Sequence, residues 1–195
     1  MALHEGPLDE EDQVAVVLDA RSGDLDGLRE IFTKFIHPKL LIECKDPETK
    51  STPLHMAAAN GHLEVIKYML SIVEPENRKE WVNLQNQTGN TALHWATLNG
   101  HLDVVKLLCD EHEADPFIKN QFGFDAIYEA ESKDKEEIET YYLTKYDVQP
   151  EDNENDDEPA TTSNVQISEG TEIEQVTKEA TEVLNARTAD LSLSK

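Results

Sequence analysis

A fifteen-residue segment occurs twice in this chain, and the repetition constrains the fold more than any other feature. Residues 52–66 read TPLHMAAANGHLEVI, and residues 91–105 read TALHWATLNGHLDVV, so that the second copy begins 39 positions after the first. Self-similarity at a period of about 20–50 residues indicates stacked units that cannot bury their apolar faces alone. We therefore expect an elongated stack of similar units with a continuous core.

Each copy has the chemistry of a helical hairpin. Pro53 suits a first helical turn, because the N–H that proline lacks has no partner there. Gly61 and Gly100 follow the first apolar stretch and predict a helix end with left-handed backbone angles. A second apolar stretch with helical spacing follows each glycine. Alanines favour close approach of the helices, and we interpret Met56 and Trp95 beside them as core residues.

Both copies resemble the ankyrin repeat, whose signature is Thr-Pro-Leu-His-x-Ala. The resemblance implies an all-α fold: an ankyrin-repeat solenoid of about four helix-turn-helix repeats. It also implies that His55 and His94 form hydrogen bonds with the preceding threonine and the neighbouring turn, which ties one repeat to the next.

Weaker copies flank the strong pair, as expected where terminal repeats face water. Aligning Gly23 with Gly61 places Leu18 on a core column, and Asp134 stands where the last copy should have glycine. We predict a domain over residues 9–146 after an N-terminal extension at 1–8, with repeats near 14–50, 51–90, 91–124 and 125–146. The extra residues of the first two repeats are assigned to loops at 38–50 and 71–90, where insertions are tolerated. Trp81, in the second of these loops, either pins the loop or meets a partner.

The last part of the chain differs from the rest in charge. Ten acidic residues and no basic residue lie between Lys145 and Lys178, a composition that repels itself and stays extended. We predict an acidic, largely disordered tail at 147–195. A short apolar stripe with a capping box at Thr171 and Glu174 predicts a helix near 172–186 that forms only against a surface.

Charge also limits the class of partner. The chain carries 41 acidic and 17 basic residues and a formal net charge of −24, which argues against direct nucleic-acid binding and favours a basic protein. No apolar stretch is long enough for a membrane span, and residues 1–12 lack the basic-then-apolar order of a signal peptide. Two cysteines, Cys44 and Cys109, fit a reducing compartment as buried free thiols. We expect a protein of the cytoplasm and nucleus.

The sequence favours neither catalysis nor a metal or cofactor. The seven histidines invite a metal interpretation, but His55, His62, His94 and His101 recur with the repeat and do not converge on one point. No phosphate-binding glycine loop or nucleophile motif occurs. We therefore predict no enzyme activity, no metal and no cofactor.

What remains is a protein-binding surface. Ankyrin solenoids present a concave face built from first helices and loop tips, and the acidic composition predicts a negatively charged cradle. Leu98 is the favoured exposed apolar contact. The predicted partner-binding residues are Asp46, Glu48, Ala59, Asn60, Asn86, Gln87, Leu98, Asn99, Asn120, Gln121, Glu151, Asp152, Asp156 and Asp157.

A narrower resemblance rests on segment 89–116, on Tyr146-Asp147-Val148 and on tail residues 170–182. These resemble fungal ankyrin-repeat chaperones dedicated to a newly made KH-domain protein of the small ribosomal subunit. The resemblance implies that the chain keeps this basic client soluble and delivers it to the nucleus for 40S assembly. The alternative is an ankyrin-repeat adaptor or inhibitor of a signalling or transcription protein.

Overall fold

Pairs of consecutive helices make up the described part of the chain, residues 3–146 of a computed structural model. They are α1 (Glu10–Ser22) with α2 (Leu25–Glu30), α3 (Pro53–Ala59) with α4 (Leu63–Ile72), α6 (Ala92–Leu98) with α7 (Leu102–Glu111), and α8 (Ala126–Ser132) with α9 (Glu136–Tyr146). The predicted all-α solenoid is confirmed for these residues. The acidic tail at 147–195, with the helix predicted near 172–186, lies outside the described residues.

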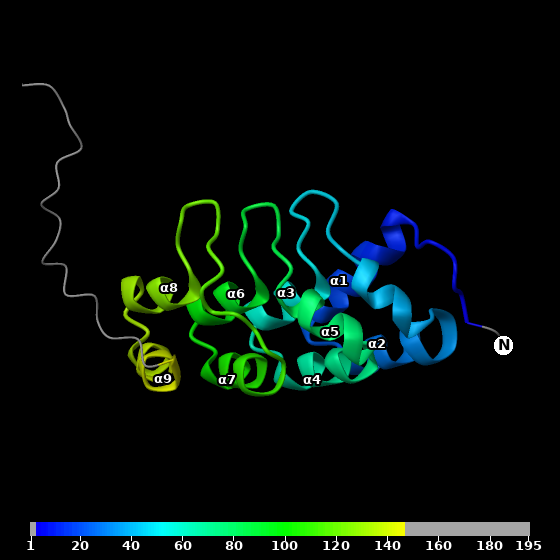
Figure 1. Ribbon diagram of the computed structural model, residues 1–195. Helices are drawn as coiled ribbons and strands as arrows, with labels where there is room; N and C mark the ends of the chain where they lie inside the picture. Colours follow the sequence, from blue (N-terminus) through cyan, green and yellow to red (C-terminus); the bar gives the residue numbers. More distant parts are fainter. Residues whose placement is uncertain (1–2, 147–195) are drawn as a thin grey trace, which may run out of the picture. The chain divides into compact units, whose positions relative to one another are not determined.

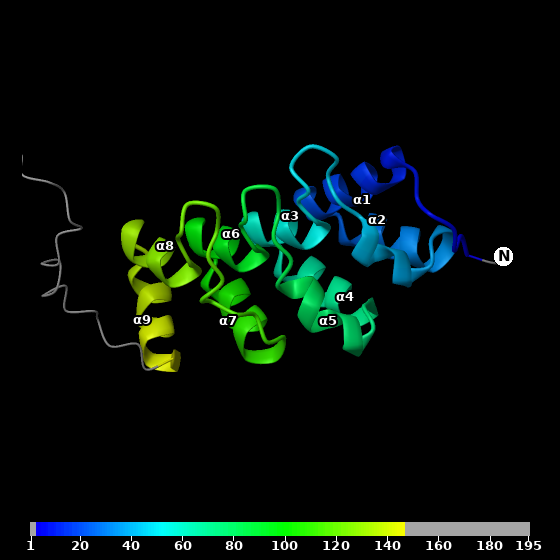
Figure 2. The same ribbon diagram turned by 45° about the horizontal axis from the view of Figure 1, so that its top comes forward.

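The helices form two layers (Figures 1 and 2). The inner layer consists of α1, α3, α6 and α8, each of which packs against the next. The outer layer contains α2, α4, α7 and α9, each in contact with the inner helix of its own pair. Three long loops, residues 44–52, 83–91 and 112–125, project to one side as fingers (Figure 1). The fingers therefore project on the side of the stack that the inner helices form (Figure 1).

The core lies between the layers and runs the length of the stack. Buried side chains of the inner helices, such as Leu54 and Leu93, meet those of the outer helices, such as Ile66 and Leu108. Tyr142 of α9 closes the last repeat with its ring fully buried, and its hydroxyl lies 2.8 Å from the Thr97 hydroxyl. Because each helix is short, most of its stability comes from this packing.

Left-handed turns join the paired helices. Gly61 and Gly100 have φ of +71° and +80°, as the sequence predicts. At Gly61 a Cβ atom would lie 2.6 Å from Nδ1 of His101 in the next repeat, so this glycine also makes room for a neighbour. In the last repeat Asp134 replaces glycine and still adopts φ of +53°. Aspartate tolerates this region better than most residues, so the degenerate repeat keeps its turn.

The insertion in the second repeat is a helix, so assigning its extra residues to a loop was wrong. Helix α5 (Pro75–Val82) begins with proline at its first turn and buries Trp81 and Val82 against the core. Trp81 is 2 % exposed, which settles its role as a packing residue. In the first repeat, a π-helical turn η1 (Ile31–Phe35) and a 3-10 helix η2 (Pro38–Glu43) occupy the corresponding stretch.

The N-terminal extension packs on this first repeat. The backbone of His4 donates to Phe35 and accepts from His37, at 2.7 and 2.9 Å, and Leu8 is buried. Across the described residues, every helix is too short or too polar to cross a membrane.

Candidate functional site

A groove of about 410 Å³ opens between the inner helices and the fingers of the first repeats. Its floor is formed by α3 and α6, and its wall by residues of the first two fingers. The lining residues are Arg21, Thr49, Ser51, His55, Met56, Ala59, Asn60, Asn86, Gln87, Thr88, Trp95 and Asn99. Five of the predicted partner-binding residues are among them: Ala59, Asn60, Asn86, Gln87 and Asn99.

An apolar row crosses the inner helices at one position of the repeat. Leu18, Met56 and Trp95 each stand five residues before the glycine that ends their helix, and we call these three residues the apolar ladder. Met56 and Trp95 are half-buried and line the groove, and Leu18 is 52 % exposed. The prediction that these side chains belong to the core was therefore wrong. Their position in the helix faces the fingers, whereas the buried positions of the same helices face the outer layer.

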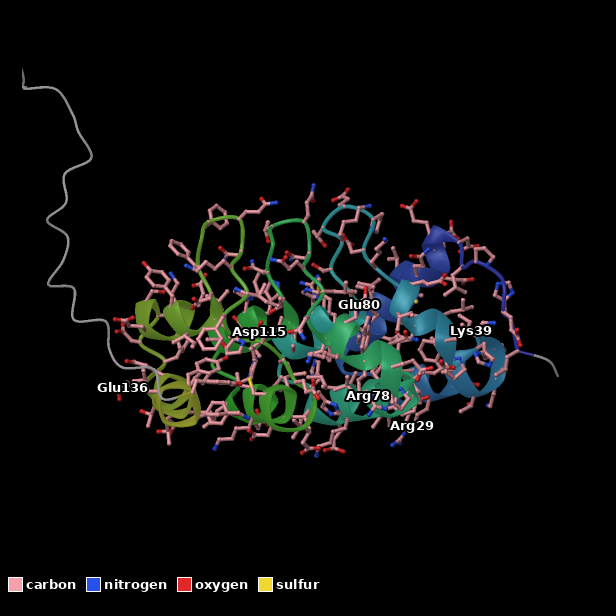
Figure 3. All side chains as sticks on the ribbon, in the orientation of Figure 1. Arg29, Lys39, Arg78, Glu80, Asp115 and Glu136 are labelled. Atoms are coloured by element: carbon pink, nitrogen blue, oxygen red, sulfur yellow. The ribbon has the colours of Figure 1, made fainter. Side chains whose placement is uncertain are left out.

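The groove is electrically almost neutral. Its one charged lining residue is Arg21, since burial holds His55 neutral. Acidic side chains gather elsewhere on the described residues, in the first turn of α1 and the first turn of α9. The labelled Glu80, Asp115 and Glu136 lie below the finger tips in Figure 3. The predicted negatively charged cradle is thus not the lining of the groove.

Threonine–histidine pairs hold the floor in place. The Thr52 N–H donates to Nδ1 of His55 at 3.2 Å, and Nε2 of His55 donates to the Asn90 carbonyl at 3.0 Å. His94 makes the same bonds to Thr91 and to the Phe124 carbonyl, at 3.1 and 3.2 Å. Burial lowers the pKa of His55 to about 4 and lowers that of His94. Each neutral imidazole therefore ties its helix to the next finger, as the resemblance predicts.

The asparagines of the fingers are mainly turn anchors. Asn86 accepts the amide of Asn90 at 3.0 Å and donates to the Ser51 hydroxyl at 3.2 Å. Asn120 accepts the amides of Phe122 and Phe124. Both asparagines are less than 10 % exposed, so little of either side chain is left for a partner. Their partner-binding role stays a prediction.

Other predicted contacts lie at the edges. Asp46 accepts two backbone amides and the hydroxyl of Thr49; these bonds, led by the Thr49 amide, lower its pKa. Glu48 and Gln121 are exposed on fingers, and Leu98 is half-buried and does not line the groove. The four tail residues, Glu151, Asp152, Asp156 and Asp157, lie outside the described residues.

The two cysteine thiols, the remaining reactive groups, have a structural role. Both thiols are buried, and burial raises the pKa of Cys44 to about 12 and that of Cys109 to about 11. Within residues 3–146, no group of three or more histidines, cysteines and carboxylates is arranged to hold a metal ion. The groove offers shape, apolar contact and amide hydrogen bonds.

An exposed aromatic cluster on the last finger and α8 was missed by the sequence analysis. It consists of Phe122, Phe124 and Tyr128, which are 68, 37 and 46 % exposed. The rings stack in order, with centroids 6.5 Å apart for the two phenylalanines and 4.5 Å apart for Phe124 and Tyr128. Three aromatic residues within seven positions, at the end of the repeat row, were the available signal.

Comparison with known proteins decides the family. Residues 20–120 match the family described as ankyrin repeats in three copies. The chain belongs to the ankyrin-repeat family. It is 60 % identical to the ankyrin repeat-containing protein YAR1 of Saccharomyces cerevisiae, with all of both chains covered. The narrower resemblance noted from the sequence is therefore confirmed.

The ankyrin-repeat stack also matches a solved structure, the crystal structure of the yeast ribosomal protein Rps3 in complex with its chaperone Yar1. The match has a TM-score of 0.72 and 63 % identity, and it covers 75 % of this chain and all of the matched chain. The solved relative is a chaperone, and the ankyrin repeat is not an enzyme family.

Proposed function

We propose that this chain is a dedicated chaperone of a newly made, basic ribosomal protein of the small subunit. It binds the client, keeps it soluble and delivers it to the nucleus for 40S assembly, so that it works in both cytoplasm and nucleus. The observation that carries the proposal is the 60 % identity, over the full length of both chains, to the chaperone that is found in complex with Rps3. The protein acts by binding, without catalysis.

The groove supports a two-part mode of binding. The apolar ladder offers contact that salt hardly affects, because burial of apolar surface needs no charge. The acidic residues outside the groove, within a net charge of −24, attract a basic client over longer distances and speed its encounter. Release follows when rRNA phosphates compete for the client's basic residues.

A solubility assay tests the proposal. Purified yeast Rps3, diluted from denaturant into 50 mM salt, should aggregate alone and stay soluble with an equimolar amount of this chain, as followed by light scattering. Aggregation at the same rate in both samples would dismiss the chaperone function. Capture of signalling or transcription proteins from extract, with no ribosomal protein among them, would favour the adaptor alternative.

A pair of variants tests the place of binding. Met56→Glu with Trp95→Glu puts two charges into the groove and should abolish protection of the client. Phe35→Glu is the control for an added charge outside the groove, because Phe35 is 59 % exposed and lies on η1, away from the groove lining. Equal protection by both variants would move the binding site away from the groove.

A further inference from the structure

The aromatic cluster of Phe122, Phe124 and Tyr128 has a structural cause. Tyr128 stands at the position that His55 and His94 occupy in the preceding repeats, where the imidazole bonds to a carbonyl of the next finger. After α8 the described chain continues directly into α9, so no further finger among the described residues meets Tyr128. Its ring instead stacks on Phe124 and leaves one face to solvent.

Two carboxylates are built into the same corner. Asp125 caps α8 by accepting the amide of Tyr128 at 2.9 Å. The Glu129 carboxylate accepts from the side-chain amide nitrogen of Asn120 at 3.4 Å. The side-chain oxygen of Asn120 in turn accepts the backbone amides of Phe122 and Phe124. Glu129 is only 7 % exposed, so of the two carboxylates the half-buried Asp125 is the one open to a ligand.

This combination fits a guanidinium group. A cation is attracted to the face of an aromatic ring, and arginine adds planar stacking that lysine lacks. Elsewhere the described residues use such contacts internally: Arg29 lies over Tyr68 at 5.7 Å, and Lys106 lies over Tyr141 at 5.9 Å. Among the described residues, no cation lies over the rings of the cluster.

We propose that Phe122, Phe124 and Tyr128, with Asp125 adjacent in sequence to Phe124, form a binding site for arginine side chains of a basic partner segment. The inference rests on the proposed function, because it takes the basic client as the source of the arginine. The site lies on the last finger and α8, whereas the groove is lined by residues of α1, α3, α6 and the first two fingers. It gives the stack a second contact, selective for arginine over lysine.

Peptides separate this inference from the proposed function. Hexa-arginine and hexa-lysine carry equal charge, and the full-length chain should bind hexa-arginine about three- to tenfold more tightly by isothermal titration calorimetry. Phe122→Leu with Tyr128→Leu keeps apolar bulk but removes two aromatic rings. Only the part of the preference for hexa-arginine that comes from the unchanged acidic residues should then remain. Phe122→Tyr with Tyr128→Phe keeps the rings and should keep the preference.

The same variants are then measured with Rps3. The leucine pair should weaken binding about three- to tenfold while the aromatic pair leaves it unchanged. Phe122 and Tyr128 are both exposed, so every variant should remain folded at the assay temperature, as checked by thermal unfolding. Equal binding of the two peptides by the original chain would overturn the inference, as would a leucine pair that retains the full preference. A dimer of this chain that the leucine pair dissociates would assign the cluster to a second copy and overturn it as well. None of these results bears on whether the chain protects Rps3.

Discussion

Protonation of His55 should destabilise the stack, and the size of the effect can be worked out from the structure. The imidazole is 1 % exposed; its Nδ1 accepts the Thr52 amide, and its Nε2 donates to the Asn90 carbonyl. A second proton at Nδ1 would face the Thr52 N–H, with only the Thr52 hydroxyl at 2.8 Å to accept it, and would place a charge in the core. Burial therefore lowers the folded pKa from the usual value of 6.5 to about 4.

The sign and size of the pH effect follow from linkage. Between these two pKa values the unfolded chain binds a proton that the folded chain does not, so stability falls as the pH falls. The contribution is complete above about pH 6.5 and decreases toward pH 4. At pH 5 the loss is about 1.5 pH units times 1.36 kcal/mol, or about 2 kcal/mol.

Urea unfolding of the original chain and of His55→Gln, at pH 7.5 and pH 5, measures this loss. Many carboxylates also titrate in this range, but they are common to both proteins and cancel in the difference between them. The stability advantage of the original chain over the variant should shrink by about 2 kcal/mol at pH 5. An advantage that is the same at both pH values would refute the reasoning. His94→Gln repeats the test in the next repeat, with a change of the same sign.

Three further predictions concern the ladder, the turns and the thiols. Leu18→Ala should weaken binding of Rps3 about fivefold at every salt concentration, since about half of a leucine contribution of ~2 kcal/mol is available at a 52 % exposed side chain. A steep change with salt would contradict this. Gly61→Ala should destabilise the fold by ~1–3 kcal/mol more than Gly100→Ala in urea unfolding. Both glycines have positive φ, but a Cβ at Gly61 would lie 2.6 Å from the His101 ring, whereas a Cβ at Gly100 would lie 3.6 Å from the Lys135 amine. Cys44 and Cys109, with pKa raised to about 12 and about 11 by burial, should react with a thiol reagent at pH 8 only after unfolding; immediate reaction of the native chain would show that they are not protected.

The repeated segment contains most of the information about the fold. The glycine turns and the alanine-rich inner helices follow from residues 52–66 and 91–105, because each has a local physical cause, and the resemblance of these residues to the ankyrin repeat predicted the threonine–histidine pairs. Helix α5 was not predictable in the same way. Its sequence, PENRKEWV, has little apolar periodicity, and its position depends on Trp81 and Val82 packing against a core made by other repeats.

The site was harder to predict than the fold because exposure at a given helix position depends on tertiary context. Met56 and Trp95 look like core residues beside buried alanines, yet the fingers stand away from them and leave a groove. Asn86 and Asn120 look like polar surface residues, yet their side chains satisfy the amides of their own turns. Net charge indicated a basic partner and could not indicate where on the surface the charge lies.

That separation of charge from groove has a consequence for release. In the proposed mode of binding, apolar contacts hold the client in the groove without neutralising its cations, whereas exposed acidic residues are screened beyond about 8 Å at physiological salt. Much of the client's positive charge therefore stays available to rRNA while the groove is still occupied. We expect rRNA to speed dissociation of the Rps3 complex in proportion to its concentration, because it binds the complex before the chaperone leaves. Stopped-flow measurements with a labelled chaperone would follow this rate. A rate that stays at the spontaneous dissociation rate at every RNA concentration would mean that RNA captures only free client, and the acidic surface would then have to cover the cations itself.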